Sequence, residues 1–363
     1  MKEQPIVQLP SQEKDRLFFL DFLKAISIVA VVSFHAIFLP RSSFITSDGI
    51  IETLFAPLRF CVPVFLTISM FLFERQIANS PKEPKLLFKT RFNRLGIPIL
   101  FWFSIAAGLK LINGNSIIEI IVAIFQGEIF TGAYYFLIIL QLLWNFVLVR
   151  DWIIQEKNIV TTLIAQAVCL LFVYATISGF FVDEVLKVLI FLERPLIIYW
   201  LAYIALGVYI YQNFDSIERV SRSLSKTNKI LLLCFTAATM MAEYRVLTFF
   251  LADSLRPFDY AAFSCILSVP TMFICFASVN EKSLPSPIVK LTKILSKYSL
   301  GIFCINGILA QIFLSIGTRL FSQASFNLVE ILGIKIIGWI GLLLLSLLLS
   351  IVLKRLGLKR MVC

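Results

Sequence analysis

The chain has 363 residues, of which 59% are hydrophobic, with a mean hydropathy of +0.90 and a formal net charge of +11. This composition is far too apolar for an ordinary soluble domain. The basic excess follows the expected membrane topology, so we interpret it as contact with anionic membrane lipid and expect no nucleic-acid partner. The seven cysteines are scattered without a CxxC pair, so we expect neither a disulfide framework nor a metal site.

Apolar stretches of membrane-spanning length recur along the whole sequence. A hydrocarbon core of about 30 Å requires about 20 apolar residues in a helix. We predict about ten such spans, at roughly 17–39, 54–74, 92–112, 133–149, 159–178, 195–213, 230–251, 260–279, 299–318 and 331–353. The segment 115–130 is apolar but short and is broken by Gly114, Gln126 and Gly127, which favours a re-entrant or interfacial segment. The sequence therefore predicts an all-α integral membrane protein with about ten transmembrane helices.

Basic residues are distributed unequally between the two sets of connecting segments. The two ends and the even-numbered loops hold 23 of the 33 Lys and Arg residues, whereas the odd-numbered loops hold five beside ten acids. Positive residues favour the cytoplasmic side, so we expect both termini in the cytoplasm and a multi-pass protein of the cell membrane. We predict a cytoplasmic tail at 1–16, one transmembrane domain at 17–353 and a cytoplasmic tail at 354–363. The polar start argues against a cleavable signal peptide.

The single histidine, His35, shares a predicted helix with Lys24. Eleven residues turn an α-helix through about 1100°, so the two side chains lie within roughly 20° of one face and about 16 Å apart. Ionisable groups in a bilayer are costly and usually face a protein interior or a water-filled path. His35, in the outer half of the span, is a candidate general base, and the alternative is a buried histidine bonded between helices. Lys24, which Asp21 could pair with, either faces that path or snorkels to the inner interface.

Several other charges lie in or beside the predicted spans. Arg91 and Arg94 are three residues apart at the inner end of the third span, so they share a helix face. They are candidates for binding an anionic group, and the alternative is charge that only sets topology. Arg59, Glu243 and Arg245 lie toward the outer side and are candidates for substrate binding. The alternative for these three is ion pairing that holds helices together.

The order of several motifs resembles the membrane-bound acyltransferase 3 family. Its hallmark is an Arg or Lys, ten residues and a His, which the stretch LDFLK at 20–24 through VVSFH at 31–35 resembles. Further segments agree in order, namely VPVFLTIS at 62–69, RFNRLGIP at 91–98, GAYYFL at 132–137, YIALG at 203–207 and SLGIFCIN at 299–306. The last of these commonly ends in a histidine, for which this chain has Asn306. Asparagine donates and accepts hydrogen bonds, but it cannot act as a base.

The resemblance implies an enzyme of the class that transfers acyl groups other than aminoacyl groups. It implies transfer of an acyl group, usually acetyl, from cytoplasmic acyl-CoA to a hydroxyl of a cell-surface glycan or glycolipid. Acyl-CoA is then a co-substrate, and no permanently bound cofactor is expected. In this interpretation His35 takes a proton from the acceptor hydroxyl and Lys24 orients the donor or neutralises charge. Arg91 and Arg94 would bind the CoA phosphates.

Two alternatives are kept beside this interpretation. The transferred group could be another acyl group, such as succinyl. A polytopic transporter or a lipid-linked sugar flippase without acyl-transfer activity would also have many spans and buried charges. Transporters typically have internal repeats and apolar segments that are broken by glycine or proline at symmetric positions. This sequence shows no internal repeat and few such symmetric breaks. An acyltransferase is therefore the favoured function.

Overall fold

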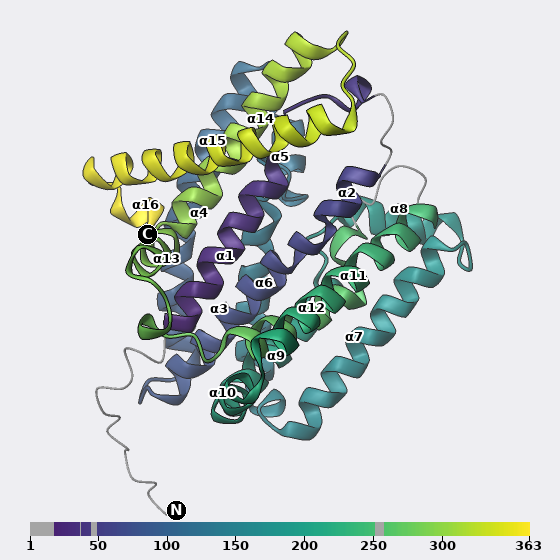
Figure 1. Ribbon diagram of the computed structural model, residues 1–363. Helices are drawn as coiled ribbons and strands as arrows, with labels where there is room; N and C mark the ends of the chain where they lie inside the picture. The colour runs from purple at the N-terminus through teal and green to yellow at the C-terminus, as the bar shows by residue number, and fades with distance from the viewer. Residues whose placement is uncertain (1–17, 37, 45–48, 251–257) are drawn as a thin grey trace, which may run out of the picture.

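The computed structural model describes residues 18–36, 38–44, 49–250 and 258–363. These residues form helices and short 3-10 turns and no strand, apart from one isolated bridge between Phe44 and Phe326. The tail predicted at 1–16 lies outside the described residues. The predicted all-α membrane protein is confirmed by the helices that follow (Figure 1).

Eight segments of the described chain are long and apolar enough to cross a membrane. The second of them joins α2 (Ile50–Phe55), the 3-10 turn η4 (Ala56–Phe60) and α3 (Cys61–Ala78). The other seven are single helices: α1 (Phe18–His35), α4 (Pro84–Ile112), α6 (Tyr134–Ile153), α7 (Glu156–Ile177), α11 (Lys226–Phe250), α14 (Ser299–Phe321) and α15 (Leu328–Arg355).

Two shorter apolar helices occupy the positions of the sixth and eighth predicted spans. They are α9 (Leu201–Gln212) and α12 (Phe263–Phe276). Each is shortened at its start, because the chain first runs through a 3-10 turn, η5 (Ile197–Tyr199) or η6 (Phe258–Tyr260). Their apolar sequences extend over these turns, which is why composition predicted longer helices.

The remaining helices connect the apolar ones. They are α5 (Ile117–Phe125), α8 (Asp183–Leu192), α10 (Phe214–Ser223), α13 (Ser286–Lys297) and α16 (Lys359–Val362), with 3-10 turns η3 (Arg41–Ser43) and η7 (Glu281–Ser283). The segment 115–130 forms only α5, which a capping box of Ser116 and Glu119 starts and which is too short to span a membrane. In the segment 354–363, α16 packs against α4, where the Trp102 indole donates a hydrogen bond to the Met361 carbonyl at 2.9 Å.

Helix α1 lies inside the bundle, in contact with α3, α13, α14 and α15 (Figure 1). In its apolar window 61% of the residues are buried, against 17% in α15, so α1 is an inner helix and α15 an outer one. Helix α15 crosses α1 obliquely, and the Trp339 indole donates a hydrogen bond to the Val29 carbonyl at 3.1 Å. An enclosed α1 places the polar side chains of that helix among protein atoms.

Helix α3 is anchored to two of its neighbours. Its Glu74 side chain, 4% exposed, forms an ion pair with Arg150 of α6, with both contacts at 2.8 Å. Helix α9 packs closely on its other side, because a Cβ at Gly207 would lie 2.4 Å from the Met70 Cβ. These contacts hold α3, α6 and α9 together next to α1.

Candidate active site

Two cavities lie along α1, one at each end of the helix. The first, of about 720 Å³, is lined by Asp21 and Lys24 of α1, and we call it the inner cavity after the predicted orientation. The second, of about 580 Å³, is lined by Phe34 and His35, and we call it the outer cavity. Lys24 and His35, which the sequence predicts to lie on one face of a helix, thus each line one of the two cavities.

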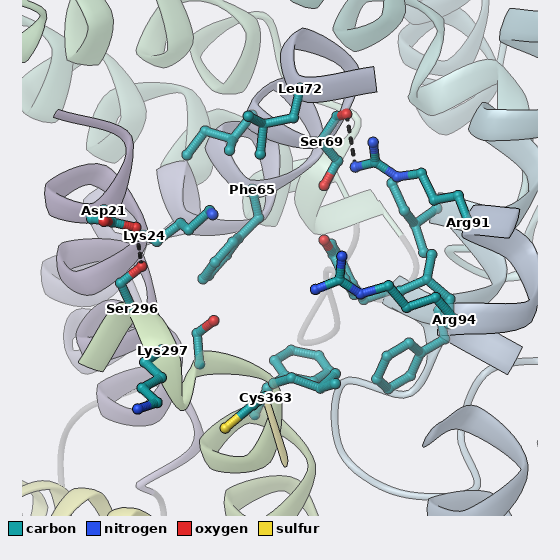
Figure 2. A pocket seen from close by; sticks show the side chains of 18 of the residues that line it. Asp21, Lys24, Phe65, Ser69, Leu72, Arg91, Arg94, Ser296, Lys297 and Cys363 are labelled. Carbon is teal, nitrogen blue, oxygen red and sulfur yellow. Dashed lines mark hydrogen bonds between the residues drawn. The ribbon is translucent and has the colours of Figure 1, made fainter. Parts of the chain in front are cut away.

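Three cations predicted from the sequence line the inner cavity: Lys24, Arg91 and Arg94. Lys24 extends from one wall and the two arginines from the opposite wall, on α4 (Figure 2). Arg91 donates a hydrogen bond to the Ser69 carbonyl at 3.1 Å and lies over the Phe73 ring at 5.2 Å. Among the residues that the structure places, no hydrogen bond or ion pair joins Lys24 or Arg94 to another side chain, and both point into the open space.

Asp21 lies beside Lys24 on α1, but the suggested ion pair between them does not form. The Asp21 carboxylate instead accepts a hydrogen bond from the Ser296 hydroxyl at 2.6 Å. The reason is the packing of α13 along α1, which brings Ser296 to Asp21. Lys24 therefore keeps its ammonium group directed into the cavity (Figure 2).

His35 ends α1 in the outer cavity, and Asn306 of α14 orients its ring. The Nδ1 atom of His35 lies 2.6 Å from Oδ1 of Asn306. The Asn306 amide nitrogen donates to the carbonyls of Ile302 and Phe303, so the amide oxygen is the atom that faces the ring. Because that oxygen only accepts, the neutral imidazole carries its proton on Nδ1 and its lone pair on Nε2. Asn306, which stands where the resembling family commonly has a histidine, thus contacts His35 directly.

Gly132 allows the loop before α6 to lie against the imidazole. Its φ of +92° is in the left-handed region, where glycine is favoured. A Cβ at this position would lie 3.1 Å from Cε1 of His35 and 3.1 Å from Cζ of Phe303. A side chain at 132 would therefore displace His35 or Phe303.

Phe303 lies where the two cavities approach each other. It lines the inner cavity, with its ring centroid 5.3 Å from that of Tyr135 and 5.5 Å from that of Phe136. The same ring packs against Gly132, which lines the outer cavity. Phe303 therefore contacts residues of both cavities.

The three residues predicted to bind substrate occupy different environments. Arg59 lines the outer cavity and is buried. Glu243 lines neither cavity: its carboxylate accepts hydrogen bonds from the backbone N–H groups of Phe263 at 2.9 Å and Ser264 at 2.7 Å, at the start of α12.

Arg245 is exposed and lies near Gly49. Because Glu243 and Arg245 are two residues apart on α11, they point to different sides of the helix. The structure thus brings Arg59 to His35 and leaves the other two outside the outer cavity.

Lys335 also lines the outer cavity, and its role did not emerge from the sequence. Its ammonium group donates to the Ser33 carbonyl of α1 at 3.0 Å and lies 4.2 Å from the centroid of the Phe55 ring. Ser33 holds one of the last four carbonyls of α1, which have no partner within the helix. The signal in the sequence was a single lysine early in the last apolar run, of the kind that usually marks a functional position in a span.

A second contribution to the outer cavity comes from the segments next to α9 and α12. Arg194 and Asp259 both line it and form an ion pair with two contacts of 2.8 Å. The Arg194 guanidinium also lies 4.9 Å from the centroid of the Tyr134 ring. This pair satisfies its own charges, so it contributes shape and hydrogen-bonding groups rather than net charge.

A comparison with protein families agrees with the order of motifs. A family model described as an acyltransferase domain, that of acyltransferase 3, matches residues 17–355, which include all the lining residues of both cavities except Cys363. Comparisons with curated proteins and with solved structures each returned no match. The resemblance seen in the sequence is confirmed by a match over nearly the whole chain, and the protein therefore belongs to the acyltransferase 3 family.

Proposed function

We propose that the protein transfers an acyl group, with acetyl as the expected one, from cytoplasmic acyl-CoA to a hydroxyl of a cell-surface glycan or glycolipid. Family membership supports membrane acyl transfer in general. The observation that carries the finer proposal is the pair of cavities at the two ends of α1. One is lined by Lys24, Arg91 and Arg94, which suit an anionic donor, and the other holds His35, which suits an uncharged hydroxyl.

The donor is expected to bind in the inner cavity. Lys24 and Arg94 extend into it and suit the phosphates of CoA, which are best bound by cations with unused donors. Phe65 and Leu72 supply apolar wall for the pantetheine arm. The rise of α1 between Lys24 and His35, about 16 Å, is comparable with that arm in its extended form. The thioester would then reach the aromatic cluster around Phe303.

The chemistry follows from the orientation of His35. Nε2 takes the proton of the acceptor hydroxyl while the oxygen attacks the thioester carbonyl carbon. The new C–O bond forms, the C–S bond breaks, and the CoA thiolate receives the proton from the imidazolium. Asn306 accepts from Nδ1–H throughout, which keeps the ring in the tautomer that this step requires.

Replacing Arg91 or Arg94 by Ala should raise the KM for acyl-CoA by about 10–100-fold, the usual effect of losing a hydrogen bond to a charged group. The kcat should change much less, because phosphate contacts are equal in the ground and transition states. Initial rates of label transfer from radioactive acetyl-CoA in membranes give both constants. Lys85→Ala is the matched control, since Lys85 is exposed on the same helix and lines neither cavity. If all three variants behave alike, the arginines do not bind the donor.

Replacing Asn306 by Leu should lower kcat by about 10–100-fold and leave the KM for acyl-CoA unchanged. The leucine fills a similar volume but removes the acceptor for Nδ1–H, so the ring loses its orientation. Asn306→Asp keeps an acceptor oxygen and should retain more activity than the leucine variant. A leucine variant with the kcat of the unmodified protein would show that Asn306 does not position His35.

A further inference from the structure

Arg59 is a buried cation of the outer cavity whose donors are not fully used. It is 6% exposed, and its guanidinium carbon lies 4.7 Å from the centroid of the Phe34 ring and 4.4 Å from that of Tyr244. Aromatic rings attract the charge, but they accept no in-plane hydrogen bonds. Among the described residues, Nε and Nη1 have no hydrogen-bond partner, and no carboxylate lies within ion-pair distance of the guanidinium. Buried donors normally have partners, and the residues that the structure describes supply none for these two donors, which suits a bound ligand.

Lys335 is a second buried cation of the same cavity. It is 5% exposed, and it too forms no ion pair with a carboxylate in the segments that the structure describes. One of its three N–H groups is used by the Ser33 carbonyl. Because Ser33 lies two residues before His35, this ammonium group lies beside the end of the helix that carries the candidate base.

The remaining charges do not cancel these two cations. Arg194 is neutralised by Asp259 in an ion pair of 2.8 Å. Glu52 also lines the cavity, and it is the other carboxylate among the lining residues. Among the lining residues that the structure describes, three cations and two carboxylates leave one net positive charge when His35 is neutral. A neutral glycan would leave this charge uncompensated in a confined space.

We propose that the acceptor carries an anionic group, a carboxylate or a phosphate, that binds to Arg59 and Lys335 while its hydroxyl lies at His35. This inference rests on the proposed function, because it assigns a substrate class to the acceptor side of that reaction. The Arg59 guanidinium carbon lies over both rings, and a guanidinium carries its N–H donors in its own plane, in the fork that suits carboxylate and phosphate oxygens. The acceptor is therefore an acidic or phosphorylated glycan rather than a neutral one.

The test measures ligand-induced shifts of the Tm of the purified full-length protein in detergent, at matched ionic strength. The probes are methyl glucuronoside, the phosphorylated probe methyl glucoside 6-phosphate and neutral methyl glucoside. We expect the charged probes to raise the Tm, because ligands that bind the native state stabilise it, and the neutral probe to do so far less. The charged probe with the larger shift identifies carboxylate or phosphate as the recognised group.

Arg59→Gln and Lys335→Gln should each weaken binding of the charged probes by about tenfold or more. The affinity is measured as the probe concentration that gives half of the Tm shift. Arg59→Lys should keep the preference for charged probes at reduced affinity. Arg319→Gln is the matched control, because Arg319 is exposed and lines neither cavity. Equal shifts with charged and neutral probes, or unchanged affinity in both glutamine variants, would overturn the proposal.

The Tm shift caused by CoA serves as an independent reference in every variant. CoA is expected in the inner cavity, so the glutamine variants should keep this shift if they are folded. If CoA does not raise the Tm of the unmodified protein, the proposed donor site is contradicted. If CoA raises the Tm but charged and neutral probes shift it equally, only the anionic acceptor is contradicted.

Discussion

Replacing His35 by Gln should lower the kcat of acyl transfer by about 10²–10⁴-fold, the usual contribution of a general base. Glutamine keeps a polar side chain near Asn306 but cannot take a proton from a hydroxyl at neutral pH. His35 is the single histidine of the chain, so no second imidazole can replace it. Transfer of label from radioactive acetyl-CoA to the membrane acceptor measures the loss.

The control for this variant is binding at the other cavity. His35 ends α1 in the outer cavity, so donor binding near Lys24 should persist, and CoA should still raise the Tm of the variant. A His35→Ala variant removes both shape and base and should be at least as inactive. Full activity in either variant would show that His35 is not the base. His35 would then be a structural histidine that is hydrogen-bonded between helices.

Acyl-CoA should be consumed only from the cytoplasmic face of sealed membranes. Lys24, Arg91 and Arg94 line the cavity at the end of α1 that the charge distribution assigns to the cytoplasm, and His35 lies at the other end. Inside-out vesicles given labelled acyl-CoA should therefore transfer label to an acceptor in their lumen. Intact right-side-out vesicles should be inactive, and they should gain activity when detergent opens them.

The comparison requires vesicles whose sealing is verified with an impermeant probe. Equal activity in both sealed preparations would show that the donor does not enter through the inner cavity. If neither preparation transfers label, even after detergent, while a lipid-linked glycan crosses the membrane, the transporter or flippase alternative would be favoured over acyl transfer.

The fold class and the main axis of the site could be predicted from the sequence because both depend on local patterns. Apolar runs of spanning length predict membrane helices, and a spacing of eleven predicts one helix face, whatever packs around it. Helix α1 runs unbroken from Phe18 to His35, so Lys24 and His35 do share a helix. Arg91 and Arg94 follow the same rule on α4, and both line the inner cavity.

Other details depend on tertiary contacts that a local pattern does not determine. The apolar residues before α9 and α12 fit a spanning helix by composition, but the chain takes 3-10 turns there. Glu243 and Arg245 are charged residues, as a substrate site would require, but they point to different sides of α11. The Glu243 carboxylate accepts hydrogen bonds from the first backbone N–H groups of α12. The suggested pairing of Asp21 with Lys24 is replaced by the contact with Ser296.

The sequence by itself determined an α-helical membrane protein with a lysine and a histidine on one helix, since helical periodicity is a property of neighbouring residues. Only the tertiary structure decided what surrounds that histidine. Asn306 contacts His35 from 271 residues away, and Lys335 reaches Ser33 from 302 residues away. Such contacts depend on how α14 and α15 pack on α1, and no spacing within a single helix encodes that packing.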